Sequence, residues 1–162
     1  MEGNMIREIL LFSSVLTNLL IVSSSIADEK YSAGAGVGAL YNGVGVNLGI
    51  FEDYGFKYAS IGCISIGYSS KDGLLSNCGL GIGWIRSDIL SDSNRHGLGI
   101  HLGTSYNTHN NRNNLEAFIG IPYVYLFDGM GSDGWNIGVT PIIGENHGDI
   151  EGGVLLNLGY QF

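Results

Sequence analysis

The sequence predicts an all-β fold: a closed, antiparallel, up-and-down transmembrane β-barrel of about eight strands. Three observations lead to this prediction. Aliphatic residues alternate with small or polar ones along most of the chain, with the period of two that a β-strand requires. Glycine accounts for 27 of the 162 residues, which disfavours helices because each interior glycine costs about 1 kcal/mol relative to alanine. Only 14% of the residues are charged and the mean hydropathy is +0.19, a high value for a protein surrounded by water.

Residues 1–27 are expected to form a secretory signal peptide. Arg7 precedes an apolar run, and small residues then lead to Ala27, where we expect cleavage before Asp28. The apolar run is too short, and too often interrupted by polar residues, to span a bilayer as a helix. Residues 28–162 would then form a single β-barrel domain.

The net negative charge of this mature domain argues against a nucleic-acid partner. The domain carries 6 basic and 13 acidic side chains, whereas binding to nucleic acid requires basic patches that displace counterions. The histidines and cysteines do not have the spacing of zinc ligands. We therefore expect no nucleic-acid partner, no metal and no cofactor.

The first two strands are expected over residues 31–41 and 44–50. In the first, alanine and valine alternate with serine and glycine, and in the second, Val44 and its alternate neighbours are all aliphatic. Between them lies Asn42-Gly43, the dipeptide best suited to a type I′ hairpin turn. The sequence therefore predicts a tight hairpin here.

The same alternation predicts six further strands, separated by polar segments. Eight strands in 135 residues leave about 17 residues for each strand and its connection, and a membrane-spanning β-strand needs about 9 to 11. An even count returns both termini to the same side of the membrane and makes the connection over residues 87–95 a long turn on that side. The six strands are expected over residues 56–68, 79–84, 97–103, 117–127, 135–140 and 154–162.

Cys63 and Cys78 are candidates for a disulfide bond, because they flank a predicted turn on adjacent strands and an oxidising compartment favours pairing. Cys78 shares the face of Leu80, whereas Cys63 lies opposite the face of Ile64. Pairing would therefore need a β-bulge, which we place at Gly62. Two free thiols remain the alternative.

The two faces of the predicted strands suggest that the aliphatic face is outermost. The opposite face holds mostly glycine, serine, asparagine and threonine and almost no charge, whereas a water-facing sheet would normally carry charged residues. A transmembrane barrel places its aliphatic face in lipid and its small or polar face in a narrow interior. Twelve aromatic residues near strand ends would form interfacial girdles: Tyr31, Tyr41, Phe51, Tyr54, Phe56, Tyr68, Trp84, Tyr106, Phe127, Trp135, Tyr160 and Phe162.

The C-terminal segment resembles the closing strand of bacterial outer-membrane β-barrels, because Val154, Leu156, Leu158, Tyr160 and Phe162 alternate up to a terminal Phe. The resemblance implies that Leu158, Tyr160 and Phe162 are a signal read by the barrel-assembly machinery. It also implies a location in the bacterial outer membrane, among lipids and lipopolysaccharide. The chain is similar to small barrels of the OmpA/OmpX type, but it carries glycine where those barrels often carry interior charged networks.

His101, Ser105 and Glu116 are the candidate catalytic residues, all expected on the lumen face. Histidine, serine and glutamate together resemble the site of outer-membrane lipid A deacylases, in which these residues lie on the outer, lipid-facing surface. The His-x-Ser motif of that family is absent here, since Leu102 and Gly103 follow His101. A lumen histidine that only bonds to its neighbours is the other interpretation of His101.

These observations favour an outer-membrane barrel with a structural or surface-interaction role and no catalytic site. Three alternatives remain open: a lipid-modifying outer-membrane enzyme, a minor pore or acyl-chain-binding barrel, and a soluble secreted β-barrel. The sequence does not indicate an oligomeric state.

Overall fold

The structure is a computed structural model that describes residues 31–69, 73–109, 112–146 and 149–162. It is a closed antiparallel β-barrel, which confirms the predicted fold class. The expected signal peptide and its cleavage site between Ala27 and Asp28 lie outside the described residues.

The described part of the chain contains nine strand segments and one 3₁₀ turn, joined by connections. They are β1 (Tyr31–Gly38), η1 (Ala39–Tyr41), β2 (Gly43–Glu52), β3 (Gly55–Ser69), β4 (Gly73–Arg86), β5 (His96–His109), β6 (Arg112–Gly120), β7 (Tyr123–Leu126), β8 (Gly134–Asn146) and β9 (Asp149–Gln161).

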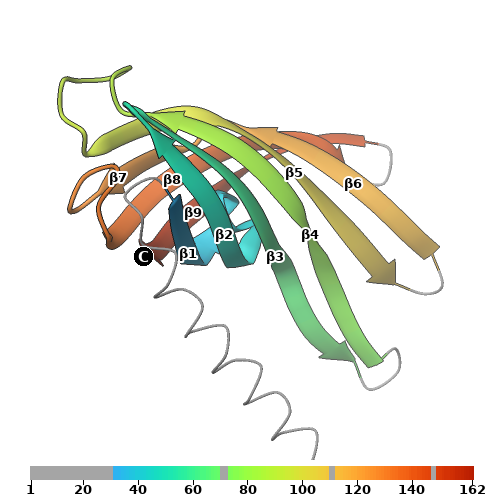
Figure 1. Cartoon of the computed structure of the whole chain (residues 1–162). Coiled ribbons are helices and arrows are strands. Elements are labelled where there is room, and N and C mark those ends of the chain that lie inside the picture. Colours follow the sequence, from blue (N-terminus) through green and yellow to red (C-terminus); the bar gives the residue numbers. More distant parts are fainter. Residues whose placement is uncertain (1–30, 70–72, 110–111, 147–148) are drawn as a thin grey trace, which may run out of the picture.

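The sheet closes on itself because β1 pairs with both β2 and β9, and β4 pairs with β5 (Figure 1). Segments β6 and β7 share one place between β5 and β8, and they are separated only at Ile121 and Pro122. Backbone hydrogen bonds continue across this break: Ile121 N donates to Pro141 O (3.0 Å), and Gly99 N donates to Pro122 O (3.0 Å). The nine described segments therefore form eight barrel strands.

The two ends of the barrel differ (Figure 1). One end, which we call the terminal end, carries the start of β1, the C-terminal Phe162 and the connections over residues 53–54, 87–95 and 127–133. The connection over 87–95 lies between β4 and β5, as predicted. The opposite end, the hairpin end, is formed by η1 and the hairpins β3–β4, β5–β6 and β8–β9, which extend beyond the short strands β1 and β2.

The connection between β1 and β2 differs from the predicted hairpin. β1 ends at Gly38 instead of Tyr41, and η1 turns into the interior of the barrel, where all three of its residues are buried. Asn42 (φ 52°) and Gly43 (φ 104°) do adopt positive φ angles, but the two-residue type I′ turn was a wrong prediction. The local sequence favours a turn, and burial of η1 in the lumen determines which turn forms.

The strands direct their aliphatic face outward and their small or polar face inward. Outward-facing Leu156 is 74% exposed and Ile150 is 79% exposed, whereas inward-facing Asn47, Asn136 and Asn157 are at most 1% exposed. A soluble protein has the reverse distribution, because apolar side chains normally leave water on folding. The predicted assignment of the two faces is therefore present in the structure.

Glycines on the inner face make room for Tyr41, the last residue of η1. A Cβ atom on Gly159 would lie 2.3 Å from the Tyr41 hydroxyl oxygen, and one on Gly36 would lie 2.6 Å from its ring. Such distances do not occur between real atoms, so the lumen holds Tyr41 only because both neighbours lack a side chain. An eight-stranded barrel has room in its interior for little more than side chains.

We predict that Gly159→Ala destabilises the barrel, whereas Gly152→Ala on the same strand does not. The methyl group at residue 159 would overlap the buried Tyr41 ring, at an expected cost of about 1–3 kcal/mol. At residue 152 the nearest atom, Ile142 O, is 3.8 Å away. Urea unfolding in detergent micelles, followed by tryptophan fluorescence, measures both free energies. Equal effects of the two substitutions would contradict the tight packing around Tyr41.

Candidate functional site: the lumen and the outer wall

The 3₁₀ turn η1, which we call the plug, is held in the lumen by asparagines from three strands. Asn47 Nδ2 donates to Leu40 O (3.2 Å), Leu40 N donates to Asn157 Oδ1 (3.4 Å), and Asn136 Nδ2 donates to the Tyr41 hydroxyl (2.7 Å). Asparagine suits this position because its amide both donates and accepts hydrogen bonds. The polar groups of the plug thereby keep partners although they are buried.

A stack of rings, which we call the aromatic column, runs through the lumen beside the plug. Its successive ring centroids are 4.6, 5.4, 5.9 and 5.6 Å apart. Glycines again provide the space, since a Cβ on Gly83 would lie 2.4 Å from the Tyr58 ring and one on Gly103 would lie 2.2 Å from the Phe118 ring. The column consists of Phe51, Phe56, Tyr58, His101 and Phe118.

An apolar cluster closes the lumen at the terminal end. Ile85, Val124 and Leu126 point inward, with Phe56 of the aromatic column, and Met130 from the connection over 127–133 packs against them. Met130 N also donates to the backbone oxygen of Asn94 (2.7 Å), which joins the two long connections of this end. The lumen is therefore filled by side chains along the plug, the column and this cluster.

The structure places the candidate catalytic residues inside the barrel. His101 is fully buried, Ser105 is 4% exposed, and Glu116 pairs in register with Ser105. His101 and Ser105 are four residues apart on one strand, which separates their backbones by about 13 Å. His101 Nδ1 instead lies 3.0 Å from the Tyr58 hydroxyl. A nucleophile and its base must lie within hydrogen-bond reach, and this serine and histidine do not.

The same residues are also inaccessible to a lipid. The lipid A deacylases to which the sequence was compared carry their residues on the outer surface, where acyl chains can reach them. Here His101 and Ser105 face a filled lumen. This geometry agrees with the other interpretation of His101 given above, in which a lumen histidine only bonds to its neighbours.

Cys63 and Cys78 are joined by a disulfide bond and face each other in register on β3 and β4. The bulge that their pairing requires lies one residue after Cys63, at Ile64, and not at Gly62, which keeps regular register with Gly79. Because the irregularity follows the bond, Cys63 still lies on the outward face that it shares with Ile61. The disulfide therefore links the two strands where the β3–β4 hairpin begins to extend.

The C-terminal residues close the barrel. Phe162 N donates to Ala33 O (2.7 Å) and Ala33 N donates to Phe162 O (3.3 Å), so the last residue joins β9 to β1. Leu158 and Phe162 are exposed on the outer face, and the Tyr160 ring packs against Trp135 with centroids 5.5 Å apart. The expected assembly signal thus lies on the outer wall at the terminal end.

Aromatic side chains surround the outer wall at the terminal end. Three residues of the expected girdles face inward instead: Tyr41 belongs to the plug, and Phe51 and Phe56 belong to the aromatic column. The side chain of Tyr68 lies outside the described residues. The exposed aromatic residues at this end include Tyr31, Tyr54, Trp84, Phe127, Trp135 and Phe162.

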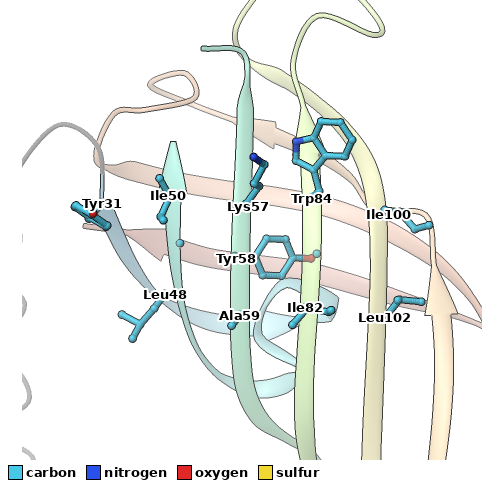
Figure 2. Close-up of a pocket in the computed structure, with 12 residues that line it drawn as sticks. Tyr31, Leu48, Ile50, Lys57, Tyr58, Ala59, Ile82, Trp84, Ile100 and Leu102 are labelled. Carbon is cyan, nitrogen blue, oxygen red and sulfur yellow. The ribbon is translucent and has the colours of Figure 1, made fainter. Parts of the chain in front are cut away.

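The outer wall also carries two open depressions lined mainly by aliphatic residues. The larger, of about 650 Å³, extends across β2, β3, β4 and β5, with Ala59 between Leu48 and Ile82 (Figure 2). Lys57 and Trp84 line the same depression, on the side toward the terminal end. The second, of about 600 Å³, lies around Ala117.

A mixed-charge patch borders the larger depression. Lys57 Nζ bonds to Glu52 Oε2 (2.5 Å), and the Arg86 guanidinium lies 5.5 Å from the Trp84 ring. Arg86 also bonds to Asp88, and this hydrogen bond holds the pKa of that carboxyl below its usual value. The patch forms a polar pocket of about 190 Å³, lined by Glu52, Asp53, Tyr54, Gly55, Lys57, Trp84 and Arg86.

Within residues 31–162, apart from the undescribed gaps, no three His, Cys, Asp or Glu side chains gather as metal ligands would. No helix in the described part of the chain has the length and hydrophobicity to cross a membrane. The chain matches no known family model, curated protein or solved structure.

Sequence reasoning missed the plug, the aromatic column and the mixed-charge patch. Phe51 and Phe56 were expected in the interfacial girdles, and Tyr58 and Phe118 carried no prediction, although the alternation places all four on the inner face. Lys57 and Trp84 are far apart in sequence and become neighbours only through the β3–β4 register. A strand-pairing map derived from the alternation could have placed them together.

We predict that Tyr41→Phe destabilises the barrel by about 1–3 kcal/mol, because it leaves the buried Asn136 Nδ2 without its acceptor. Tyr54→Phe is the matched control, since Tyr54 is 60% exposed and surface changes usually stay within about 0.5 kcal/mol. Urea unfolding in detergent micelles compares the two variants. A Tyr41→Phe protein as stable as the control would show that the plug does not depend on this hydrogen bond.

Proposed function

We propose that this chain is an outer-membrane β-barrel that has a structural or surface-interaction role and carries out no catalysis. One observation carries the proposal: the barrel presents its aliphatic residues to its surroundings and encloses its polar ones. Burial of apolar surface is worth about 25 cal/mol per Å², so a continuous aliphatic exterior is stable in lipid and unfavourable in water.

The height of the aliphatic exterior along the barrel axis is close to that of the apolar band of outer-membrane barrels. Outward residues are apolar from Trp135 to Ile143 on β8 and from Ile150 to Phe162 on β9, except for glycine. With a strand rise of 3.4 Å and a tilt of about 40°, these stretches span roughly 20 and 30 Å along the barrel axis. The apolar band of outer-membrane barrels is about 25 Å tall.

The orientation that we propose places the terminal end in the periplasm. The C-terminal Phe162 and the exposed aromatic residues would then lie at the inner interface, where such rings are favoured. The extended hairpins β3–β4, β5–β6 and β8–β9 would project from the cell, among lipopolysaccharide. These hairpins are the surface available to outside partners, which is why we favour a surface-interaction role over a purely internal one.

The lumen supports a non-catalytic role more than it supports an enzyme or a pore. His101 and Ser105 lack contact with each other and with the exterior, so neither could act on an acyl chain at the outer wall. The plug and the apolar cluster at the terminal end fill space that conduction or an acyl chain would need.

The membrane location is tested by fractionation of cells that express the full chain. We expect the protein in the outer-membrane fraction, with heat-modifiable migration on a gel. We also expect Leu156→Arg, in the middle of the apolar stretch of β9, to cost about 2–4 kcal/mol in lipid vesicles. Ile89→Arg, in the exposed connection between β4 and β5, is the control and should cost under about 1 kcal/mol.

Two results would contradict the proposed membrane location. Recovery in the soluble periplasm without heat-modifiable migration would overturn the proposal. So would a Leu156→Arg variant that is as stable as the control in vesicles.

The role of the last residue is tested by Phe162→Ser. The two backbone hydrogen bonds between Phe162 and Ala33 remain in this variant, so refolding of the purified protein in detergent should change little. If Phe162 is read by the barrel-assembly machinery, the amount assembled in the outer membrane should fall several-fold. Phe127→Ser, another exposed aromatic at the same end, is the control. Equal assembly of both variants would exclude Phe162 as the signal.

A further inference from the structure

The mixed-charge patch and the larger depression form one continuous amphipathic surface. Lys57 and Trp84 line both of them, so the polar pocket and the aliphatic groove share a border. Figure 2 shows these two residues at one end of the groove. The groove is an open depression of about 650 Å³. Its position next to the terminal-end aromatic residues corresponds to a membrane interface, if the chain spans the membrane as proposed above.

The patch carries charges of both signs. Lys57 and Arg86 contribute two cations to the pocket, and Glu52 and Asp53 contribute two carboxylates. Asp88 adds a third carboxylate, bonded to Arg86. A purely anionic headgroup would meet these carboxylates without compensation. A headgroup with a phosphate and an ammonium group matches both signs, because the phosphate favours the cations and the ammonium favours the carboxylates.

The existing ion pairs leave donors for such a headgroup. Lysine has three N–H donors and arginine has five, more than the single carboxylate partner of each uses. Exposed ion pairs contribute little by themselves, so their side chains can reorient at small cost. The indole of Trp84 lies between the polar pocket and the groove, as interfacial tryptophans do.

We propose that this surface binds one phospholipid whose headgroup carries a phosphate and a primary ammonium group, with an acyl chain in the groove beside Ala59. The phosphate lies at Lys57 and Arg86, and the ammonium lies at Glu52 and Asp53. A quaternary ammonium headgroup binds more weakly, because it cannot donate hydrogen bonds to these carboxylates. The site rests on the proposed membrane location.

The two tryptophans of the chain provide an internal comparison. Trp84 lines the site, whereas Trp135 lies on β8, outside both depressions. The Trp135→Phe variant therefore reports on the site, and the Trp84→Phe variant reports on ordinary lipid contact. Each is reconstituted in phosphatidylcholine vesicles containing a minor fraction of brominated phosphatidylethanolamine, phosphatidylglycerol or phosphatidylcholine, which quench nearby tryptophan.

We expect brominated phosphatidylethanolamine to quench Trp84 with a relative association constant on the order of 3- to 10-fold above the other two lipids. Trp135 should show no such preference. In the Trp135→Phe background, Arg86→Gln should remove most of the preference, whereas Arg95→Gln, an exposed arginine of the neighbouring connection, should retain it.

Three outcomes would overturn the inference: equal quenching of Trp84 by all three lipids, a preference for phosphatidylglycerol, or an Arg86→Gln variant that keeps the preference. In each of these cases both tryptophans are still quenched by lipid, so the proposed membrane location survives. If no brominated lipid quenches either tryptophan, the membrane location itself fails.

Discussion

The width of an eight-stranded barrel is the constraint on which the rest of this structure depends. The interior of such a barrel is just wide enough for side chains, so the volume of the inward side chains must match the volume of the interior. Here the filling comes from rings as large as those of Tyr41 and Tyr58, which fit only because the facing strands carry glycine. The abundance of glycine, which first served as evidence against helices, is therefore a packing requirement. At Gly36, Gly83, Gly103 and Gly159, the chain accepts the entropic cost of glycine to make room for a ring.

A filled lumen also determines where the polar groups of the chain lie. The plug brings the backbone of Leu40 and the hydroxyl of Tyr41 into the interior. Asparagines on β2 and β9 bond to that backbone, and an asparagine on β8 bonds to the hydroxyl. Because buried polar groups that lack partners are costly, the plug and these asparagines act as one unit. The outer face is then left to aliphatic residues, and this division is the observation on which the proposed membrane location rests.

Alternation predicted most of the fold, because the period of two is a local property of each strand. It located the strand faces, the long connection over 87–95 and the closing strand. It failed where a tertiary contact decides the local structure. Asn42-Gly43 is typical of a tight turn, yet burial of Tyr41 draws the chain inward. Pro122 interrupts a strand that the alternation predicts as continuous. The bulge lies at Ile64, two residues after its expected place at Gly62, because register depends on the partner strand.

The candidate site was harder to predict than the fold, because its residues meet only through strand pairing. His101, Ser105 and Glu116 suggested chemistry when considered as residue types, but the structure places them on the inner face of the barrel, with His101 and Ser105 out of hydrogen-bond reach of each other. Trp84 was expected only in an aromatic girdle and Lys57 carried no prediction, yet register places them side by side at the edge of an aliphatic groove. The proposed binding surface therefore depends on the register of β3 and β4, which no local pattern of the sequence reveals. That register brings Lys57 and Trp84 together near the terminal end, where Glu52, Asp53 and Arg86 line the same pocket.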